Sequence, residues 1–230
     1  MKKKAIAVLG GMGPEASVYM YKLFIEKSIS EFGARHNDEF PEIILHSIPV
    51  PDFISSNDKR DEALLMLKER VRALNKLNIS CIGIACNTAH VLLEELQSVS
   101  RVPFVSMLDE VAKAVKKDNI KRVGILGTPS TLREQLYEGV LEKYEIKPIA
   151  ATKNSYPQLE RAIRNVIAGK DSKQDAVGLV RLADSLQEEG AGGIILGCTE
   201  LPLVFPVAYK LPVYNSVAIL ATALLRRYYK

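Results

Sequence analysis

The sequence predicts an α/β fold with two similar lobes, each built on a mostly parallel sheet flanked by helices. Short apolar segments of β-strand composition alternate with longer amphipathic segments along the 230 residues, and this alternation is typical of parallel sheets covered by helices. Landmarks of the first half also recur in the second half in the same order, as expected of an internal duplication.

The alternation assigns each element in turn. Apolar runs predict strands at residues 5–9, 43–47, 80–85, 104–106, 122–126, 147–150, 193–197 and 212–214. Amphipathic segments predict helices at 14–32, 59–77, 87–98, 108–117, 131–144, 156–168, 173–189 and 216–229. Pro14 suits the first position of the first helix, and Ser130 suits the N-cap of the helix over 131–144.

Three matched landmarks support the duplication. They pair Gly10 with Gly127, Cys86 with Cys198, and Pro103 with Pro212. Because the spacing between partners is nearly constant, we expect a first lobe at residues 1–107 and a second at 108–215. The last segment, 216–230, is expected to return to the first lobe.

Composition and charge exclude several classes of protein. Apolar residues make up 47% of the chain, charged residues 25%, and the net charge is +4, which is ordinary for a soluble globular protein. The basic cluster Lys2 to Lys4 has no interleaved aromatic residues, so nucleic-acid binding is not expected. The apolar run 5–9 is too short for a secretion signal or a membrane span. Three cysteines without an export signal indicate the reducing cytoplasm.

Two cysteines follow two similar predicted strands. Cys86 lies in CIGIACNTAH (81–90) and Cys198 in GGIILGCTELP (192–202), each where an apolar run gives way to polar residues that start a helix. Ligands bind at this edge of an open α/β sheet, and a helix N-terminus is expected to lower the pKa of a thiol. Two thiols in one pocket are suited to moving a proton between the two faces of a carbon atom, which is racemisation or epimerisation without a cofactor. Cys81 is expected to be a buried core residue.

Other interpretations of these motifs are weaker or stay open. The loop GGMGPEA (10–16) fits the dinucleotide pattern GxGxxG/A. The second predicted strand, however, ends in His46 and Ser47 and not in the acidic residue that binds a ribose in dinucleotide sites. We expect this loop to approach a small substrate instead. Cys86 and His90 have the spacing of a nucleophile and base in a hydrolase, although a histidine here is more often structural. No grouping has metal-site spacing, and a non-catalytic binder would need neither cysteine.

With GGMGP at 10–14, CNTAH at 86–90 and GCTELP at 197–202, the sequence resembles the aspartate/glutamate racemase superfamily, and within it the aspartate racemase branch. The resemblance covers essentially the whole chain. It implies an active site in the cleft between the two lobes, an amino-acid substrate and no cofactor. It also implies that Cys86 and Cys198 are the acid and base. Another thiol isomerase of the superfamily is the alternative, and pairing into a homodimer is left open.

The resemblance also implies substrate-binding residues. Asn87, Thr88 and Thr199 are expected to hold the α-carboxylate and amine. The further expected contacts are Met12, Ser47, Ala89, Thr128 and Glu200.

Several positions depart from the family pattern. Leu9 and Glu200 occupy the places where glutamate racemases carry a helper Asp and His. Phe53 and Ile167 occupy the places where aspartate racemases carry an Arg and a Lys. We therefore expect either a relaxed preference that includes uncharged amino acids, or an acidic preference that depends on Lys59 or Arg60. His46, at the end of a strand, is an open candidate.

Overall fold

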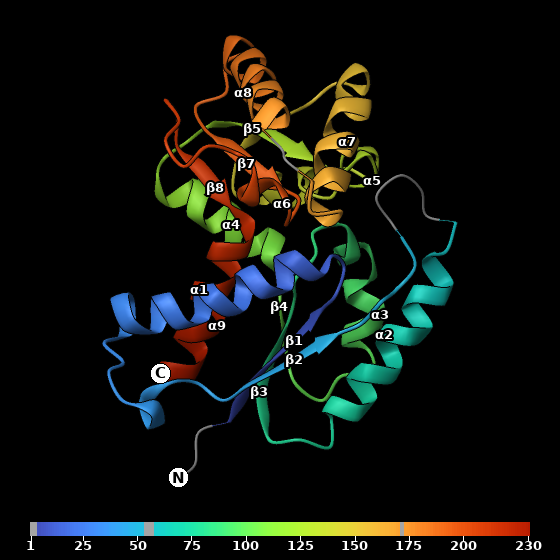
Figure 1. The fold of residues 1–230 in the computed structure, drawn as a ribbon, viewed down its shortest axis with the longest axis vertical. Helices are drawn as coiled ribbons and strands as arrows, with labels where there is room; N and C mark the ends of the chain where they lie inside the picture. The colour runs from blue at the N-terminus through green and yellow to red at the C-terminus, as the bar shows by residue number, and fades with distance from the viewer. Residues whose placement is uncertain (1–3, 53–57, 171–172) are drawn as a thin grey trace.

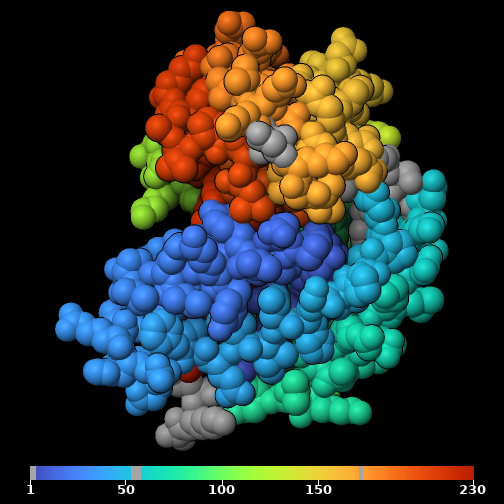
Figure 2. Space-filling view, in the orientation of Figure 1, coloured from blue at the N-terminus to red at the C-terminus, as the bar shows by residue number. Residues whose placement is uncertain are grey.

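The computed structural model describes residues 4–52, 58–170 and 173–230. Within them are two parallel four-stranded sheets, the first in the lower half of the view and the second in the upper half (Figure 1). In the space-filling view the lower half is mainly blue to cyan and the upper half mainly yellow to red (Figure 2). The first sheet consists of β1 (Ala5–Gly10), β2 (Ile43–Ser47), β3 (Ile79–Ile84) and β4 (Phe104–Val105). The second consists of β5 (Arg122–Gly127), β6 (Lys147–Ala150), β7 (Ile194–Gly197) and β8 (Val213–Asn215). The predicted α/β class with two parallel sheets is confirmed.

The two sheets have the same topology. Their strand orders are β2-β1-β3-β4 and β6-β5-β7-β8, and every pairing is parallel. The helices that follow β4 and β8 also begin alike, since Ser106 and Asn215 act as their N-caps. This repetition is what an internal duplication predicts.

Helices flank both sheets. They are α1 (Pro14–Phe32), α2 (Arg60–Leu74), α3 (Leu93–Gln97), α4 (Met107–Lys117), α5 (Pro129–Arg133), α6 (Glu138–Lys143), α7 (Tyr156–Ile167), α8 (Lys173–Glu188) and α9 (Ser216–Tyr229). Short 3₁₀ turns lie at Asn37–Glu39, Thr88–Leu92, Lys153–Ser155 and Leu201–Leu203. None of the helices in the described part is both long and apolar enough to span a membrane.

Two predicted helices are wrong in detail. The expected helix over 131–144 is divided into α5 and α6, with Gln135 between them at a φ of 51°. Its N-cap is Thr128 and not Ser130, because Pro129 takes the first helical position and the Thr128 hydroxyl accepts the N–H of Thr131. The expected helix over 87–98 likewise begins as a 3₁₀ turn before α3.

The C-terminal helix α9 packs against the first sheet. It contacts β1 and β3 as well as α1 and α4, and Leu224 on α9 is fully buried over Gly83 of β3. Cys81 is buried in the core on this side of the sheet, as predicted. The lobe boundaries at residues 107 and 215 stay a prediction.

Candidate active site

A cavity of about 280 Å³ lies where the carboxyl ends of strands from both sheets meet. It is lined by the loop 11–14, the segment 50–52 after β2, the turn 86–88 after β3, Thr128, Arg164, Ile167, and the turn 198–200 after β7. A volume at the low end of the range for ligand pockets suits one small molecule. A larger open groove, lined by residues 32–34 and 37–42 with Tyr228 and Tyr229, contains neither Cys86 nor Cys198.

Both predicted cysteines line this cavity. Cys86 follows β3 and Cys198 follows β7, and these strands hold equivalent positions in their sheets. Only 7% of Cys86 and 4% of Cys198 is exposed. A charge on Cys86 raises the pKa of Cys198, so the two sulfurs are within electrostatic reach of each other.

The expectation that helix N-termini lower the pKa of these thiols is wrong. Burial raises the pKa of Cys86 to about 12, although the backbone N–H groups of Ala89 and Thr88 act in the opposite direction. Burial and the charge of Glu200 raise the pKa of Cys198 well above its usual value. Removal from water therefore outweighs the backbone donors at both thiols.

Glu200 connects Cys198 to the opposite lobe. Its Oε2 atom accepts hydrogen bonds from the Cys198 thiol and the Thr199 hydroxyl, both at 3.0 Å. Its Oε1 atom accepts the backbone N–H of Gly13 at 3.1 Å. A Cβ atom at position 13 would lie 2.9 Å from that oxygen, so glycine is needed for this approach.

Asn87 is held at both ends of its side-chain amide. Its Nδ2 atom donates to the Ser216 hydroxyl at 3.0 Å, and its Oδ1 atom accepts the Tyr137 hydroxyl at 2.6 Å. The Ser216 hydroxyl in turn donates to the Leu196 carbonyl at 2.8 Å. Both Asn87 and Tyr137 are 1% exposed, so this network fixes the turn after Cys86.

Three buried hydroxyls join the lobes beside the cavity. Thr88 Oγ1 lies 2.9 Å from Thr128 Oγ1 and 3.1 Å from Thr131 Oγ1. Thr128 and Thr131 are themselves hydrogen-bonded at 2.9 Å. Each hydroxyl has one donor and two acceptor positions. The three mutual hydrogen bonds use all three donors, so the triad keeps acceptor positions that a substrate amine could fill.

The predicted substrate contacts divide into two groups. Six of them line the cavity, namely Met12, Asn87, Thr88, Thr128, Thr199 and Glu200. Ala89 does not, since it lies beneath the turn with its N–H directed at the Cys86 sulfur. Ser47 does not either, because it is exposed at the end of β2.

The other open candidates lie outside the cavity lining. Arg60 is held by the carboxylates of Glu95 and Asp61, and Lys59 is exposed. His46 lies on β2 and is half-buried, with its pKa lowered by burial. Phe53 lies outside the described residues, whereas Ile167 lines the cavity as expected.

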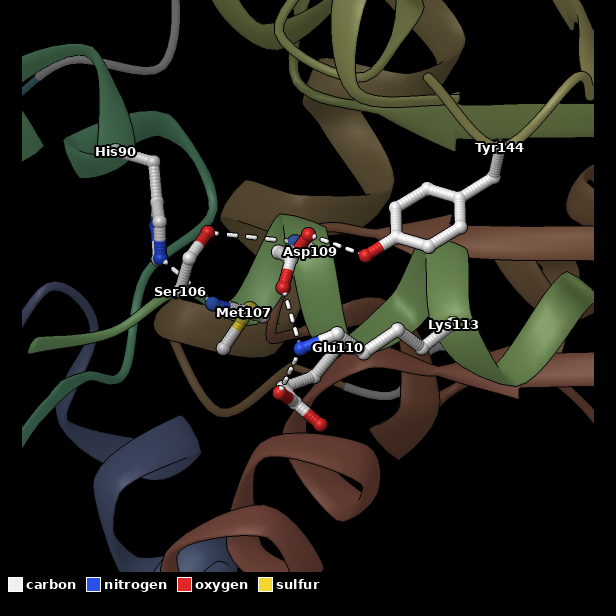
Figure 3. A network of polar contacts seen from close by, with 7 residues as sticks. All are labelled: His90, Ser106, Met107, Asp109, Glu110, Lys113 and Tyr144. Atoms are coloured by element: carbon white, nitrogen blue, oxygen red, sulfur yellow. Dashed lines mark hydrogen bonds and ion pairs between the residues drawn. The ribbon is translucent and has the colours of Figure 1, made fainter. Parts of the chain in front are cut away.

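His90 does not act on the Cys86 thiol. Its Nδ1 atom donates to the Cys86 carbonyl at 2.8 Å. Its Nε2 atom accepts the Met107 N–H at 3.0 Å, and Figure 3 shows this second contact. Burial lowers its pKa to about 4, so the imidazole is neutral near pH 7. Both ring nitrogens are thus used to hold the turn after β3 against the start of α4. This removes the base that a Cys86–His90 hydrolase requires.

Sequence reasoning missed four residues of this site. Thr131, Tyr137, Arg164 and Ser216 reach it from α5, the segment before α6, α7 and α9. Only Ser216 could have been found from the sequence, because it starts the helix after β8, the strand equivalent to β4. The other three depend on how distant helices pack.

Comparisons with known proteins agree with the fold. The model of the Asp/Glu/Hydantoin racemase family matches residues 9–224. The broad specificity amino-acid racemase RacX of Bacillus subtilis is 28% identical over 227 residues, covering 97% of both chains. An aspartate racemase homologue of Pyrococcus horikoshii superposes with a TM-score of 0.82 at 30% identity, over 99% of this chain and 100% of that one. Picrophilus torridus aspartate racemase gives a TM-score of 0.82 at 28% identity, over 97% and 93%.

Fold and relatives together define an isomerase built on two parallel sheets. The chain belongs to the Asp/Glu/Hydantoin racemase family.

Proposed function

We propose that this enzyme racemises amino acids without a cofactor, using Cys86 and Cys198 as the acid–base pair at Cα. The supporting observation is that two buried thiols from equivalent turns of equivalent sheets line one small cavity. The resemblance to a broad specificity amino-acid racemase along nearly the whole chain supports the substrate class. Three free thiols are suited to the cytoplasm, where we place the reaction.

The proposed reaction moves one proton at each face of the substrate. A thiolate on one side takes the α-proton, so the C–H bond breaks and its electron pair stays on Cα and the adjoining carboxylate. The thiol on the other side then gives its proton to the opposite face of Cα. The product is the other enantiomer, and the two sulfurs have exchanged protonation states.

Hydrogen-bond donors and acceptors around the cavity suit this reaction. Glu200 accepts from the Cys198 thiol, so it is placed to take that proton and return it. Asn87 keeps one N–H of its amide beyond the bond to Ser216 as a donor, and the threonine triad adds hydroxyl acceptors. We assign these groups to the substrate carboxylate and amine, where positioned donors stabilise the charge that develops on the carboxylate.

Serine substitution at each cysteine tests the proposal. Cys86→Ser and Cys198→Ser should each lower interconversion of the enantiomers by about 10²–10⁴, because a serine hydroxyl is a far weaker acid than a thiol and is hardly ever ionised to act as the base. Cys81→Ser is the matched control, since Cys81 is also a free buried cysteine but does not line the cavity. Chiral chromatography measures interconversion, and Cα deuterium incorporation in D₂O measures proton removal.

Either of two outcomes would contradict the proposal. One is a variant at position 86 or 198 that keeps full interconversion. The other is Cys198→Ser retaining activity while His90→Ala loses it, which is the pattern of a Cys86–His90 hydrolase.

A further inference from the structure

An ion pair between the lobes lies at the rim of the cavity. Arg164 on α7 donates from Nη2 to Asp52 Oδ2 at 2.8 Å, and Asp52 belongs to the segment after β2. Both side chains are about half exposed and both line the cavity. Arg164 is the only cationic residue of the lining within the part of the chain that the structure describes.

The charge of Arg164 is already balanced. Its Nε atom donates to Glu160 Oε1 at 2.8 Å on the same helix, in addition to the contact with Asp52. The charged residues that line the cavity are one cation, Arg164, and two carboxylates, Asp52 and Glu200. The described lining is therefore negative before any substrate binds.

Asp52 also lies near the reacting centre. Its charge contributes to the raised pKa of Cys86, which places the carboxylate within electrostatic reach of that sulfur. Pro51 and Ile167 add apolar surface to the same side of the cavity. A substrate side chain that extends from Cα toward this rim meets apolar surface and an ion pair in which the two opposite charges already balance each other.

We propose that Asp52 and Arg164 form a side-chain subsite that accepts uncharged and cationic amino acids and rejects acidic ones. This inference rests on the proposed racemase function. A second substrate carboxylate would have to displace Asp52 from Arg164 while facing the charges of Asp52 and Glu200, and like charges at short range disfavour the ionised form. A neutral side chain meets no such repulsion.

Removing the charge of Asp52 should change the specificity. In Asp52→Asn, Arg164 can offer its planar donors to a substrate carboxylate. We expect kcat/KM for aspartate and glutamate to rise about tenfold or more relative to alanine and methionine. Glu160→Gln is the matched control, because it removes one negative charge from the same guanidinium but Glu160 does not line the cavity. It should change that ratio by less than about threefold.

The double variant Asp52→Asn/Arg164→Gln should lose the gain for acidic substrates. The inference is overturned if the wild-type enzyme prefers aspartate or glutamate, or if Glu160→Gln raises their use as much as Asp52→Asn. In those cases racemisation itself would still be observed. If no amino acid exchanges its α-proton in the wild-type enzyme, the proposed function fails and this subsite fails with it.

Discussion

The thiol of Cys198 donates a hydrogen bond to the Glu200 carboxylate, with 3.0 Å between Sγ and Oε2. Cys86 is placed differently, since the backbone N–H groups of Ala89 and Thr88 point at its sulfur. An acceptor favours the protonated thiol, whereas N–H donors favour the thiolate. The two positions are therefore chemically unequal, because the surroundings of Cys86 favour loss of the thiol proton more than those of Cys198 do.

Glu200→Gln should separate the two effects of this carboxylate. The amide keeps the shape but cannot take the Cys198 proton as a carboxylate does, so the maximal rate should fall by about 10²–10⁴. Because the charge of Glu200 raises the pKa of Cys198, its removal should also shift the pH–rate profile to lower pH. Steady-state kinetics across pH measure both effects. A fall in rate with no shift of the profile would mean that Glu200 binds substrate only.

The wild-type enzyme should become faster as the pH rises. Burial raises the pKa of Cys86 to about 12, so this thiol is protonated at neutral pH. As long as the pH stays below this pKa, each unit by which the pH rises increases the thiolate fraction about tenfold, and kcat/KM should increase with it. A profile measured from about pH 6.5 to 8.5 at constant ionic strength tests this, with Cys81→Ser as a control that should give the same curve. A flat profile would show that the reacting thiol has a low pKa.

The stability of the fold should fall in mild acid because of His90. Its pKa is lowered to about 4 by burial, whereas an unfolded histidine titrates near 6.5. The neutral imidazole therefore contributes stability that is complete above about pH 6.5 and is lost as the pH falls toward 4. We expect a loss of about 2 kcal/mol between pH 7.5 and 5.0 from this group. Urea unfolding at both pH values measures it.

His90→Gln is the comparison for that experiment. Glutamine can still offer a donor and an acceptor but does not titrate, so the variant should show a smaller loss over the same pH range. Equal losses in both proteins would assign the acid sensitivity to other groups.

The packing of α9 on the first sheet should depend on Gly83. A Cβ atom at this position would lie 2.8 Å from Leu224 Cδ1 on α9. Gly83→Val therefore overpacks this contact and should lower the free energy of unfolding by about 1–3 kcal/mol. Gly139→Val is the matched control, since a Cβ there meets nothing within 4 Å. If both variants were equally stable, α9 would not be packed against β3 in solution.

The strands and most helices were predictable because their signals are local. Apolar runs such as 5–9 and 122–126 identify buried strands wherever they pack. The division between α5 and α6 could not be predicted, because Gln135 adopts a positive φ at a position where the sequence has no glycine to indicate one. Arg164 was missed for a different reason: its role follows from the position of α7 over the segment after β2, which no local pattern encodes. The thiol pKa values were misjudged because burial is a property of the assembled lobes.

The hydroxyl of Tyr137 gives a final test of how the site is held together. It donates to Asn87 Oδ1 at 2.6 Å from the second lobe, and it is 1% exposed. A charge on Cys198 raises the pKa of Tyr137, so this hydroxyl is within electrostatic reach of that sulfur. Tyr137→Phe leaves the buried Asn87 oxygen without this donor, which should lower the free energy of unfolding by about 1–3 kcal/mol. Because Asn87 follows Cys86 directly, kcat should also fall about tenfold.

Tyr144→Phe is the matched control for that variant. Tyr144 donates to Asp109 Oδ1 at 2.8 Å in the same lobe, away from the cavity (Figure 3). It should cost about 1 kcal/mol or less and leave kcat and KM unchanged. Chemical denaturation and steady-state kinetics on both variants give the two readouts. Equal kinetic losses in the two variants would point to general loosening of the second lobe, whereas a loss confined to Tyr137→Phe would show that Asn87 has to be oriented for Cys86 to act.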